Sequence, residues 1–293
     1  MVAEPAASSH APGLDPASIE IRPLATRADC DACVELQRAT WGDDFTDVVP
    51  QSILKVSQRV GGVALGAFDA NGALLGFVFG LTGVERGRVV HWSDMLAVVP
   101  RARNLGLGRR LKEAQRKIVR ELGGDVVYWT FDPLIARNAH LNFNRLGGRL
   151  GEYVVDMYGI TDSPLHGGVP TDRIVVAWPT SDMEIDARLK EADGALSSPD
   201  ALGAQIVSRK WMEEADGVSI LPHSVRVEVP LDGEQLMLTR SPDALAWRES
   251  VRRGLLWALG AGYAVSAFAY DRDASRGYYL MTKAPRHAAN GRS

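Results

Sequence analysis

The sequence predicts an α/β fold, with a mixed sheet flanked by helices and a smaller α+β segment after it. Three observations support this prediction. Two apolar runs of strand length meet at Asn71-Gly72, the strongest short hairpin signal that a sequence offers. Apolar residues then recur at helical spacing between Leu107 and Leu122. After Pro179 the composition becomes polar, which is typical of a domain boundary.

The first elements are expected to be a strand and a helix. Ile19 to Arg22 has the apolar spacing of a short strand. Thr26 is followed three residues later by Asp29, which is the pattern of an N-terminal capping box. A helix should therefore begin after Thr26 and reach about Trp41, and a shorter helix should precede the next strand.

Three strands should follow, and they give the sheet an antiparallel beginning. The hairpin signal joins a strand at Gly61–Phe68 to a strand at Ala73–Leu81. The third strand, Val89–Val99, ends at Pro100 because proline cannot donate a hydrogen bond to a neighbouring strand.

A long helix should come next, because its apolar residues lie on one face and Gly123-Gly124 supplies a C-terminal stop. The residues of that face are Leu107, Leu111, Ala114, Ile118 and Leu122. The elements expected after it are a buried strand at Asp125–Phe131, a short helix at Asn138–Leu146, and strands at Gly151–Met157 and Arg173–Trp178.

The C-terminal part is expected to form its own α+β domain, without a catalytic motif. Ser241 and Pro242 are typical of a helix start. The other elements expected are a helix at Ala201–Ala215 and strands at Ser224–Val229, Gln235–Thr239, Tyr263–Tyr270 and Gly277–Thr282. The predicted organisation is a disordered tail at 1–18, a domain at 19–179, the α+β domain at 180–284 and a second tail at 285–293.

Composition excludes several classes of protein. The longest apolar stretch, Leu255–Tyr270, is interrupted by glycine and serine and is shorter than the roughly 18 residues of a membrane span. The N-terminus lacks the order of charged and apolar residues of a signal peptide. Cys30 and Cys33 cannot form a disulfide framework and lack a second pair for zinc, so we expect them to pack in the core. We therefore expect a cytoplasmic protein without a metal site.

A Gly-x-Gly turn between a strand and a helix carries the clearest chemical signal. Glycines at Gly106 and Gly108 let backbone N–H groups approach an anion without a Cβ in the way. The segment 101–122 holds eight basic and two acidic residues, a net charge of +6 in a chain whose net charge is −3. Leu111 stands where a dinucleotide-binding motif needs its third glycine, and no Gly-Lys-Ser/Thr follows. The turn therefore predicts a phosphate site of another class.

The segments Val98–Gly108 and Asn138–Gly148 resemble two motifs of the GNAT superfamily of acyl-CoA N-acyltransferases, and the resemblance covers roughly residues 19–179. The stretch from Asn138 to Gly148 is similar to the superfamily's segment of asparagine, short helix and Leu-Gly. The segments His91–Val98 and Trp129–Pro133 resemble a bacterial branch of predicted acetyltransferases with a C-terminal extension. The superfamily's pattern Arg/Gln-x-x-Gly-x-Gly, after a Val-x-Pro strand end, is matched here by Val98, Pro100, Arg103, Gly106 and Gly108.

The resemblance implies a centrally splayed sheet that binds acetyl-CoA, or another acyl-CoA as co-substrate, where the strand Val89–Val99 diverges from Asp125–Phe131. Pantetheine would pair with backbone at Leu96–Val98, and backbone N–H groups from Arg103 to Gly108 would hold the pyrophosphate. The cofactor-binding residues that it implies are Leu96, Ala97, Val98, Arg103, Asn104, Leu105, Gly106, Leu107, Gly108, Arg109, Asn138 and Phe143.

The acid and base of the reaction are less clearly marked. Phe143 stands where the superfamily often has a tyrosine as general acid, and phenylalanine cannot donate a proton. Tyr153, Tyr158, a water molecule or unassisted departure of the thiolate could replace it. Asp94 and His91 are candidate bases, but a spacing of three puts them on opposite faces of a strand unless a bulge intervenes.

The resemblance implies an enzyme that moves an acetyl or other short acyl group to a small-molecule amine by direct attack. The alternative is an acyl-CoA-binding module without catalysis. A nucleic-acid partner is disfavoured by the net charge of −3, and no membrane partner is expected. A homodimer stays open.

Overall fold

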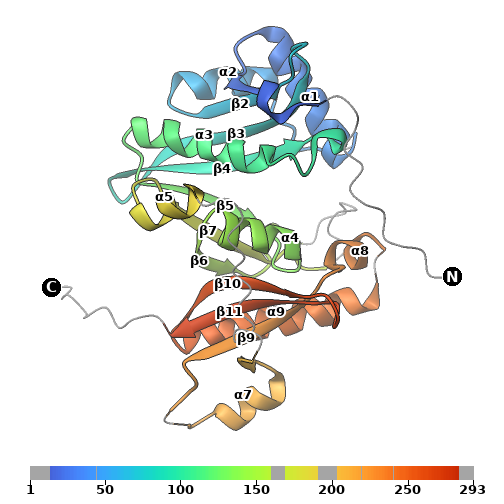
Figure 1. Cartoon of the computed structure of the whole chain (residues 1–293), viewed down its shortest axis with the longest axis vertical. Helices are drawn as coiled ribbons and strands as arrows, with labels where there is room; N and C mark the ends of the chain where they lie inside the picture. The colour runs from blue at the N-terminus through green and yellow to red at the C-terminus, as the bar shows by residue number, and fades with distance from the viewer. Residues whose placement is uncertain are drawn as a thin grey trace. The chain divides into compact units, whose positions relative to one another are not determined.

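The computed structural model describes residues 14–43, 45–159, 169–190, 203–218, 220–239 and 241–283, drawn in Figure 1. Contacts within the chain divide it into two compact units. Unit 1 is Met1–Tyr128 with Pro179–Ser181, and unit 2 is Trp129–Trp178 with Asp182–Ser293. The expected tails, apart from residues 14–18, and most of the loop after Tyr158 lie outside the described residues.

Unit 1 contains strands in the order β1-β2-β3-β4-β5, and these are antiparallel except for the parallel pair β4 and β5. The bounds of its elements are β1 (Glu20–Pro23), α1 (Arg27–Trp41), α2 (Gln51–Arg59), β2 (Val63–Phe68), β3 (Leu74–Glu85), β4 (Arg88–Val98), the short 3-10 turn η2 (Pro100–Ala102), α3 (Leu107–Glu121) and β5 (Val126–Phe131), whose last three residues belong to unit 2.

The first elements of unit 1 form where the local sequence patterns predicted them. Thr26 Oγ1 accepts from Asp29 N at 3.0 Å, and Asp29 Oδ2 accepts from Thr26 N at 2.9 Å, so the capping box is confirmed. Arg22 donates to both carboxylate oxygens of Asp29, and this hydrogen bonding lowers the pKa of Asp29. The β2–β3 hairpin is also confirmed, and Gly72 supplies the left-handed backbone at φ +79°.

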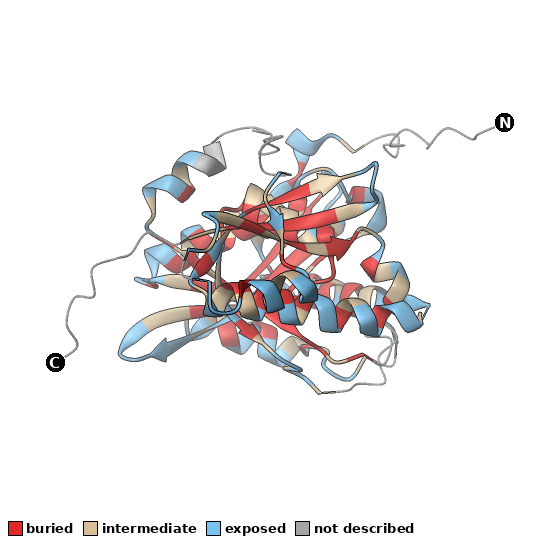
Figure 2. Cartoon of the chain, turned by 90° about the horizontal axis from the view of Figure 1, so that it is seen from below, coloured by how far each residue is buried: buried red, intermediate tan, exposed pale blue. Residues whose placement is uncertain are grey.

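One hydrophobic core cluster of unit 1 combines residues of the sheet with residues of α1 and α2. Leu24, Leu54, Phe77 and Phe79 are buried there together with both cysteines. Cys30 and Cys33 are free thiols, as expected for core residues, and burial raises the pKa of Cys33 to about 12. In Figure 2 buried residues are frequent along the strands, whereas the helices show exposed faces.

Unit 2 contains an antiparallel pair, β6 and β7, and a four-stranded sheet in the order β10-β11-β9-β8. The bounds of its elements are α4 (Ala136–Ala139), the π-helix η3 (His140–Arg145), β6 (Arg149–Val154), β7 (Arg173–Pro179), α5 (Met183–Lys190), β8 (Gln205–Ile206), α7 (Arg209–Ala215), β9 (Ser224–Pro230), α8 (Gly233–Leu238), α9 (Pro242–Gly260), β10 (Tyr263–Asp271) and β11 (Arg276–Lys283). The expected α/β and α+β classes are confirmed.

Two expected elements of the C-terminal part are wrong. The strand expected at Gln235–Thr239 is the helix α8, because Glu, Gln, Leu and Met favour a helix and outweigh a weak alternation of apolar residues. The helix expected at Ala201–Ala215 begins only at Arg209. Ser208 caps that helix by accepting from Trp211 N, and the residues before it form β8 against β9.

The compact units do not follow the boundary expected at residue 179. Segment 129–178 makes many of its distant contacts with the C-terminal residues of its own unit. Asn144 exchanges two hydrogen bonds with the backbone of Phe268, at 2.7 and 2.8 Å. The hydroxyl of Tyr279 donates to Pro133 O at 2.7 Å. These bonds explain why unit 2 begins inside β5, while the predicted domain limits at 179 and 284 stay predictions.

The helices of the described segments include none with both the length and the hydropathy that crossing a membrane requires.

Candidate functional site

A β-bulge interrupts β4 at Asp94. Phe79 of β3 pairs with Met95, but the next residue, Gly80, pairs with Ser93, so Asp94 is an extra residue on β4. Bulges bend a strand and redirect its side chains, and they are frequent beside active sites. A bulge was the condition under which the two candidate bases, Asp94 and His91, could lie on the same face of β4.

The bulge shifts the alternation of side chains along β4. Before it, His91 and Ser93 contact α3 through hydrogen bonds to Gln115 and Lys112. After it, Met95 and Ala97 belong to the core cluster that includes α1, and Leu96 lies toward Gly108 at the start of α3. Even- and odd-numbered residues have therefore exchanged faces across Asp94.

The parallel ladder between β4 and β5 is short. It joins Val90 to Val126, His91 to Val127 and Trp92 to Tyr128. Within the described part of unit 1, residues 93–98 of β4 pair with β3 only. One backbone edge of Leu96, Ala97 and Val98 is thus without a strand partner in this unit, and an extended ligand could bond to such an edge.

The turn before α3 has a left-handed backbone at two positions. Asn104 has φ +64° and Gly106, the N-cap of α3, has φ +72°. No side chain caps this helix, and its first turn holds no acidic residue. A Cβ built on Gly106 would meet nothing within 4 Å, so the space in front of this backbone is open. Backbone N–H groups in such a turn, at a helix N-terminus, favour an anion.

The basic residues around this turn are close together in the sequence, but the structure divides them into an exposed group and a group that is paired or buried. Arg101 and Arg103 are exposed at the turn. Arg110 donates to Pro16 O and Ile19 O, and Arg109 pairs with Glu113 at 2.6 Å. Lys112 and Arg116 are buried on the inner face of α3. Of the four arginines nearest the helix start, therefore, only Arg101 and Arg103 are exposed, and we take them as the candidates for an anion at the turn.

His91 lies inside unit 1 and both of its ring nitrogens are engaged. Nδ1 is 2.9 Å from Thr82 Oγ1, and Nε2 is 3.0 Å from the Gln115 side-chain nitrogen. Burial lowers the pKa of His91 to about 4. The ring is therefore neutral at pH 7, and its place in the core speaks against the expected role as a base.

Asp94 differs from His91 because it keeps contact with solvent. The surrounding chain removes part of its water, and this desolvation, followed by repulsion from Asp47, raises its pKa. A carboxylate with a raised pKa is a better proton acceptor than an ordinary aspartate. Asp94 is thus the candidate base that the geometry favours.

Asn138 and Phe143 lie in unit 2, whereas the other expected site residues lie in unit 1. Asn138 is half-buried in α4. Phe143 is buried in η3, where its ring packs edge-on against Phe131 at 5.8 Å and Tyr279 at 6.0 Å. No hydroxyl is present at this position to serve as an acid.

Tyr153 and Tyr158, the two tyrosines considered as substitutes for the general acid, both lie in unit 2, and the hydroxyl of each contacts another side chain of that unit. The hydroxyl of Tyr153 donates to Asp172 at 2.6 Å, and burial together with that carboxylate raises its pKa. Tyr158 is exposed and its hydroxyl lies 3.4 Å from Thr130 Oγ1.

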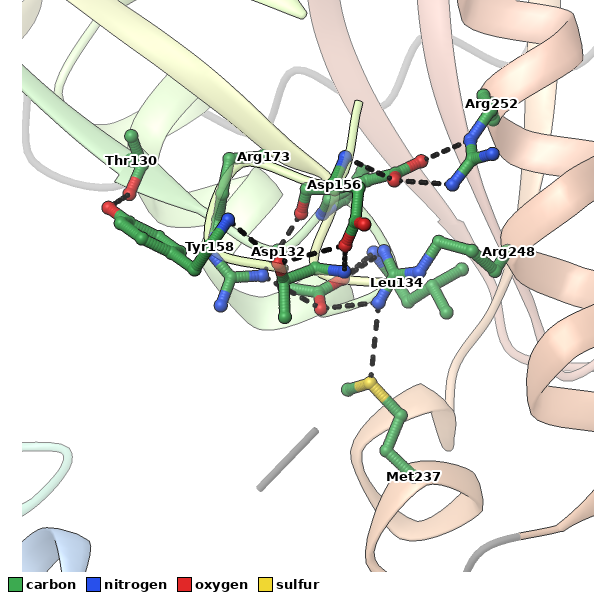
Figure 3. A network of polar contacts seen from close by, with 12 residues as sticks. Thr130, Asp132, Leu134, Asp156, Tyr158, Arg173, Met237, Arg248 and Arg252 are labelled. Carbon is green, nitrogen blue, oxygen red and sulfur yellow. Dashed lines mark hydrogen bonds and ion pairs between the residues drawn. The ribbon is translucent and has the colours of Figure 1, made fainter. Parts of the chain in front are cut away.

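A buried ion network in unit 2 was not predicted from the sequence (Figure 3). Arg248 of α9 donates to both oxygens of Asp132, at 2.8 and 2.5 Å, and Arg173 donates to the same carboxylate at 3.2 Å. Arg252, one helical turn after Arg248, binds Asp172 at 2.7 and 2.6 Å. The partners are far apart in the sequence, so no local pattern could reveal them.

Comparison with known proteins finds solved structures of similar fold, with TM-scores below 0.5. The sequence matches no protein-family model and no curated protein. The fold resembles that of yncA, a putative acetyltransferase from Salmonella typhimurium with its cofactor acetyl-CoA, at 21% identity and a TM-score of 0.44, over 60% of this chain and 98% of that chain.

Two further likenesses are similar in extent. An aminoglycoside 6'-N-acetyltransferase complexed with coenzyme A matches at 16% identity and a TM-score of 0.42, over 56% of this chain and 97% of that chain. The ribosomal-protein-S18-alanine N-acetyltransferase from Escherichia coli matches at 19% identity and a TM-score of 0.43, over 61% of this chain and 99% of that chain. Because all three TM-scores are below 0.5, we base the functional conclusion on the residues of this chain.

Proposed function

We propose that this protein is an acyltransferase that moves a short acyl group from acyl-CoA to the amine of a small-molecule acceptor. The observation that carries this proposal is the left-handed turn at Asn104 and Gly106, which starts α3 directly after a strand with one free backbone edge in unit 1. The two motifs that resemble the GNAT superfamily support the same assignment.

The pyrophosphate of CoA would bind at the turn. Backbone N–H groups from Arg103 to Gly108 would donate to its oxygens, and the positive end of the α3 dipole would favour its charge. Arg101 and Arg103 are exposed beside the turn and would pair with phosphate oxygens. The open space in front of Gly106 supports this reading, because a phosphate could approach the backbone there.

The pantetheine arm would lie along the edge of β4 that has no strand partner in unit 1, at Leu96, Ala97 and Val98, bonded to backbone as an added strand is. The thioester would then lie near the bulge at Asp94. A neutral amine attacks the thioester carbonyl, Asp94 accepts the proton of the amine, and backbone N–H groups stabilise the oxyanion. A thiol with a pKa near the 8.5 of cysteine can leave as a thiolate without an acid, so Phe143 does not bar the reaction.

A second candidate function is a non-catalytic acyl-CoA-binding module, which the buried, hydroxyl-free Phe143 favours. The assay that separates the two measures release of free thiol from acetyl-CoA by the full chain, across a panel of primary amines. Release that depends on one class of amine supports the transferase. Binding of acetyl-CoA without release for any amine supports the module.

We expect the substitution Arg103→Ala to weaken binding of CoA roughly tenfold, because a charge-assisted hydrogen bond to phosphate is worth about 1.5–3 kcal/mol in favourable geometry. Binding of pantetheine, which has no phosphate, should change little. Calorimetric titration with both ligands at one salt concentration measures the difference. Lys117→Ala removes one exposed charge further along α3 and serves as the control. Equal losses for CoA and pantetheine would contradict the place assigned to Arg103.

We expect Asp94→Asn to lower kcat by about 10²-fold or more, since a general base contributes about that factor. Affinity for acetyl-CoA should stay within a factor of a few. In the unsubstituted protein, activity requires ionised Asp94, so it should fall as the pH drops through a pKa above the 3.8 of an ordinary aspartate. Profiles of kcat/KM against pH test this, and an acidic limb that persists unchanged in Asp94→Asn would exclude Asp94 as its source.

A further inference from the structure

Four polar side chains fill part of the interface between β4 and α3 in unit 1. This polar block consists of His91 and Ser93 on the strand and Lys112 and Gln115 on the helix, and all four are buried. A helix face that packs on a sheet is normally apolar. Placing a lysine there is unfavourable unless the charge is compensated or lost.

Ser93 and Lys112 are in direct contact within the polar block. Lys112 Nζ lies 2.7 Å from Ser93 Oγ, and each residue is 4% exposed. Burial lowers the pKa of Lys112 well below its ordinary value, which favours the neutral amine over the ammonium. A neutral amine at this distance can accept the proton of the hydroxyl, which is how a serine–lysine pair forms a nucleophile.

His91 is not the base in this arrangement. Its two nitrogens are engaged by Thr82 and Gln115, and its pKa of about 4 leaves it a weak proton acceptor. The ring instead helps to hold Gln115, which is one helical turn from Lys112. The base that contacts the serine is therefore the lysine.

Ser93 also stands where the proposed acyl-CoA would bring its reactive end. It is the first residue of β4 beyond the ladder with β5 and is next to the bulge residue Asp94. Strands advance about 3.3 Å per residue, so Ser93 lies about 10 Å along β4 from Leu96, where the pantetheine arm would be bonded.

We propose that, when no amine is bound, acyl-CoA transfers its acyl group to the hydroxyl of Ser93, an inference that rests on the proposed acyl-CoA site. Ser93 Oγ attacks the thioester carbonyl and its proton passes to the neutral amine of Lys112. The carbon–sulfur bond then breaks, and Lys112 returns the proton to the CoA thiolate. The products are an ester on Ser93 and free CoA, and water or an amine can later cleave the ester and restore the hydroxyl.

The test incubates the full chain with acetyl-CoA without an amine and follows release of free thiol together with the intact mass. We expect thiol release and a one-acetyl increase in mass that hydroxylamine removes, since hydroxylamine cleaves an ester but not an amide. Ser93→Ala should abolish both signals, and Lys112→Met should slow the release by about 10²-fold or more. Ser57→Ala removes another buried serine of unit 1 and should have no effect on either signal.

Calorimetric titration of Ser93→Ala with acetyl-CoA separates the failure of this inference from failure of the proposed function. Two outcomes overturn the role of Ser93 and leave the transferase standing. In the first, acetyl-CoA binds saturably but the unsubstituted protein releases no thiol. In the second, acetyl-CoA binds saturably and thiol release persists in Ser93→Ala. An acetyl group that resists hydroxylamine and maps to Lys112 overturns it as well. Absence of binding in the unsubstituted protein overturns the proposed function and this inference together.

Discussion

The substitution Gly106→Val should weaken binding of acetyl-CoA at least about tenfold, which corresponds to about 1.4 kcal/mol. Two effects act in the same direction. A branched side chain would occupy the open space where a phosphate must approach the backbone. It would also disfavour the left-handed conformation of this residue, and with it the N–H groups at the start of α3. Calorimetric titration of the folded variant measures the loss.

Gly123→Val is the matched control for this experiment. Gly123 follows the other end of α3, has φ +79°, and a Cβ there would also meet nothing within 4 Å. It therefore carries the same backbone strain without lying near the turn. Equal effects of the two substitutions on acetyl-CoA affinity would show that strain in α3, and not access to the turn, explains the loss.

Arg248→Met should lower the free energy of unfolding by about 3–5 kcal/mol, the usual cost of removing one partner of a buried ion pair. Arg248 is 1% exposed and supplies two of the hydrogen bonds to Asp132. Methionine keeps much of the volume but leaves that carboxylate with Arg173 alone among its arginine partners. Denaturant unfolding followed by circular dichroism measures the change.

The exposed pair in the same unit provides the comparison for Arg248→Met. Arg137 and Glu234 join α4 to α8, with side chains that are 65% and 43% exposed. Arg137→Met should therefore change the free energy of unfolding by no more than about 1 kcal/mol. If the two variants lose the same stability, the buried network of Figure 3 contributes no more to the stability of the fold than an exposed ion pair does.

Elements with a local physical cause were predictable from the sequence. The capping box of Thr26 and Asp29 and the hairpin at Gly72 depend on residues a few positions apart, and both formed as expected. The helix α3 followed from its apolar spacing and its glycines. The strand expected at 235–239 failed because five residues of weak alternation cannot outweigh helix propensity and the packing of Met237.

Part of the candidate site was predictable because it, too, depends on residues that are close together in the sequence. The turn at Gly106 is encoded in consecutive residues, so its position between β4 and α3 agrees with the prediction. The inward direction of Lys112 and Arg116 could not be predicted, because charged residues are normally on the outer face of a helix. The ion pair of Asp132 and Arg248 depends on tertiary structure, since its members are 116 residues apart.

The most direct test of the central claim is calorimetric titration of the full chain with acetyl-CoA and with acetyl-pantetheine, which carries the same thioester but lacks the nucleotide and its phosphates. We predict one saturable site for acetyl-CoA, with at least about tenfold weaker binding of acetyl-pantetheine because the turn at Asn104 and Gly106 recognises phosphate. Absence of saturable binding of acetyl-CoA, or equal affinity for the two ligands, would contradict the assignment of this turn as the site of acyl-CoA.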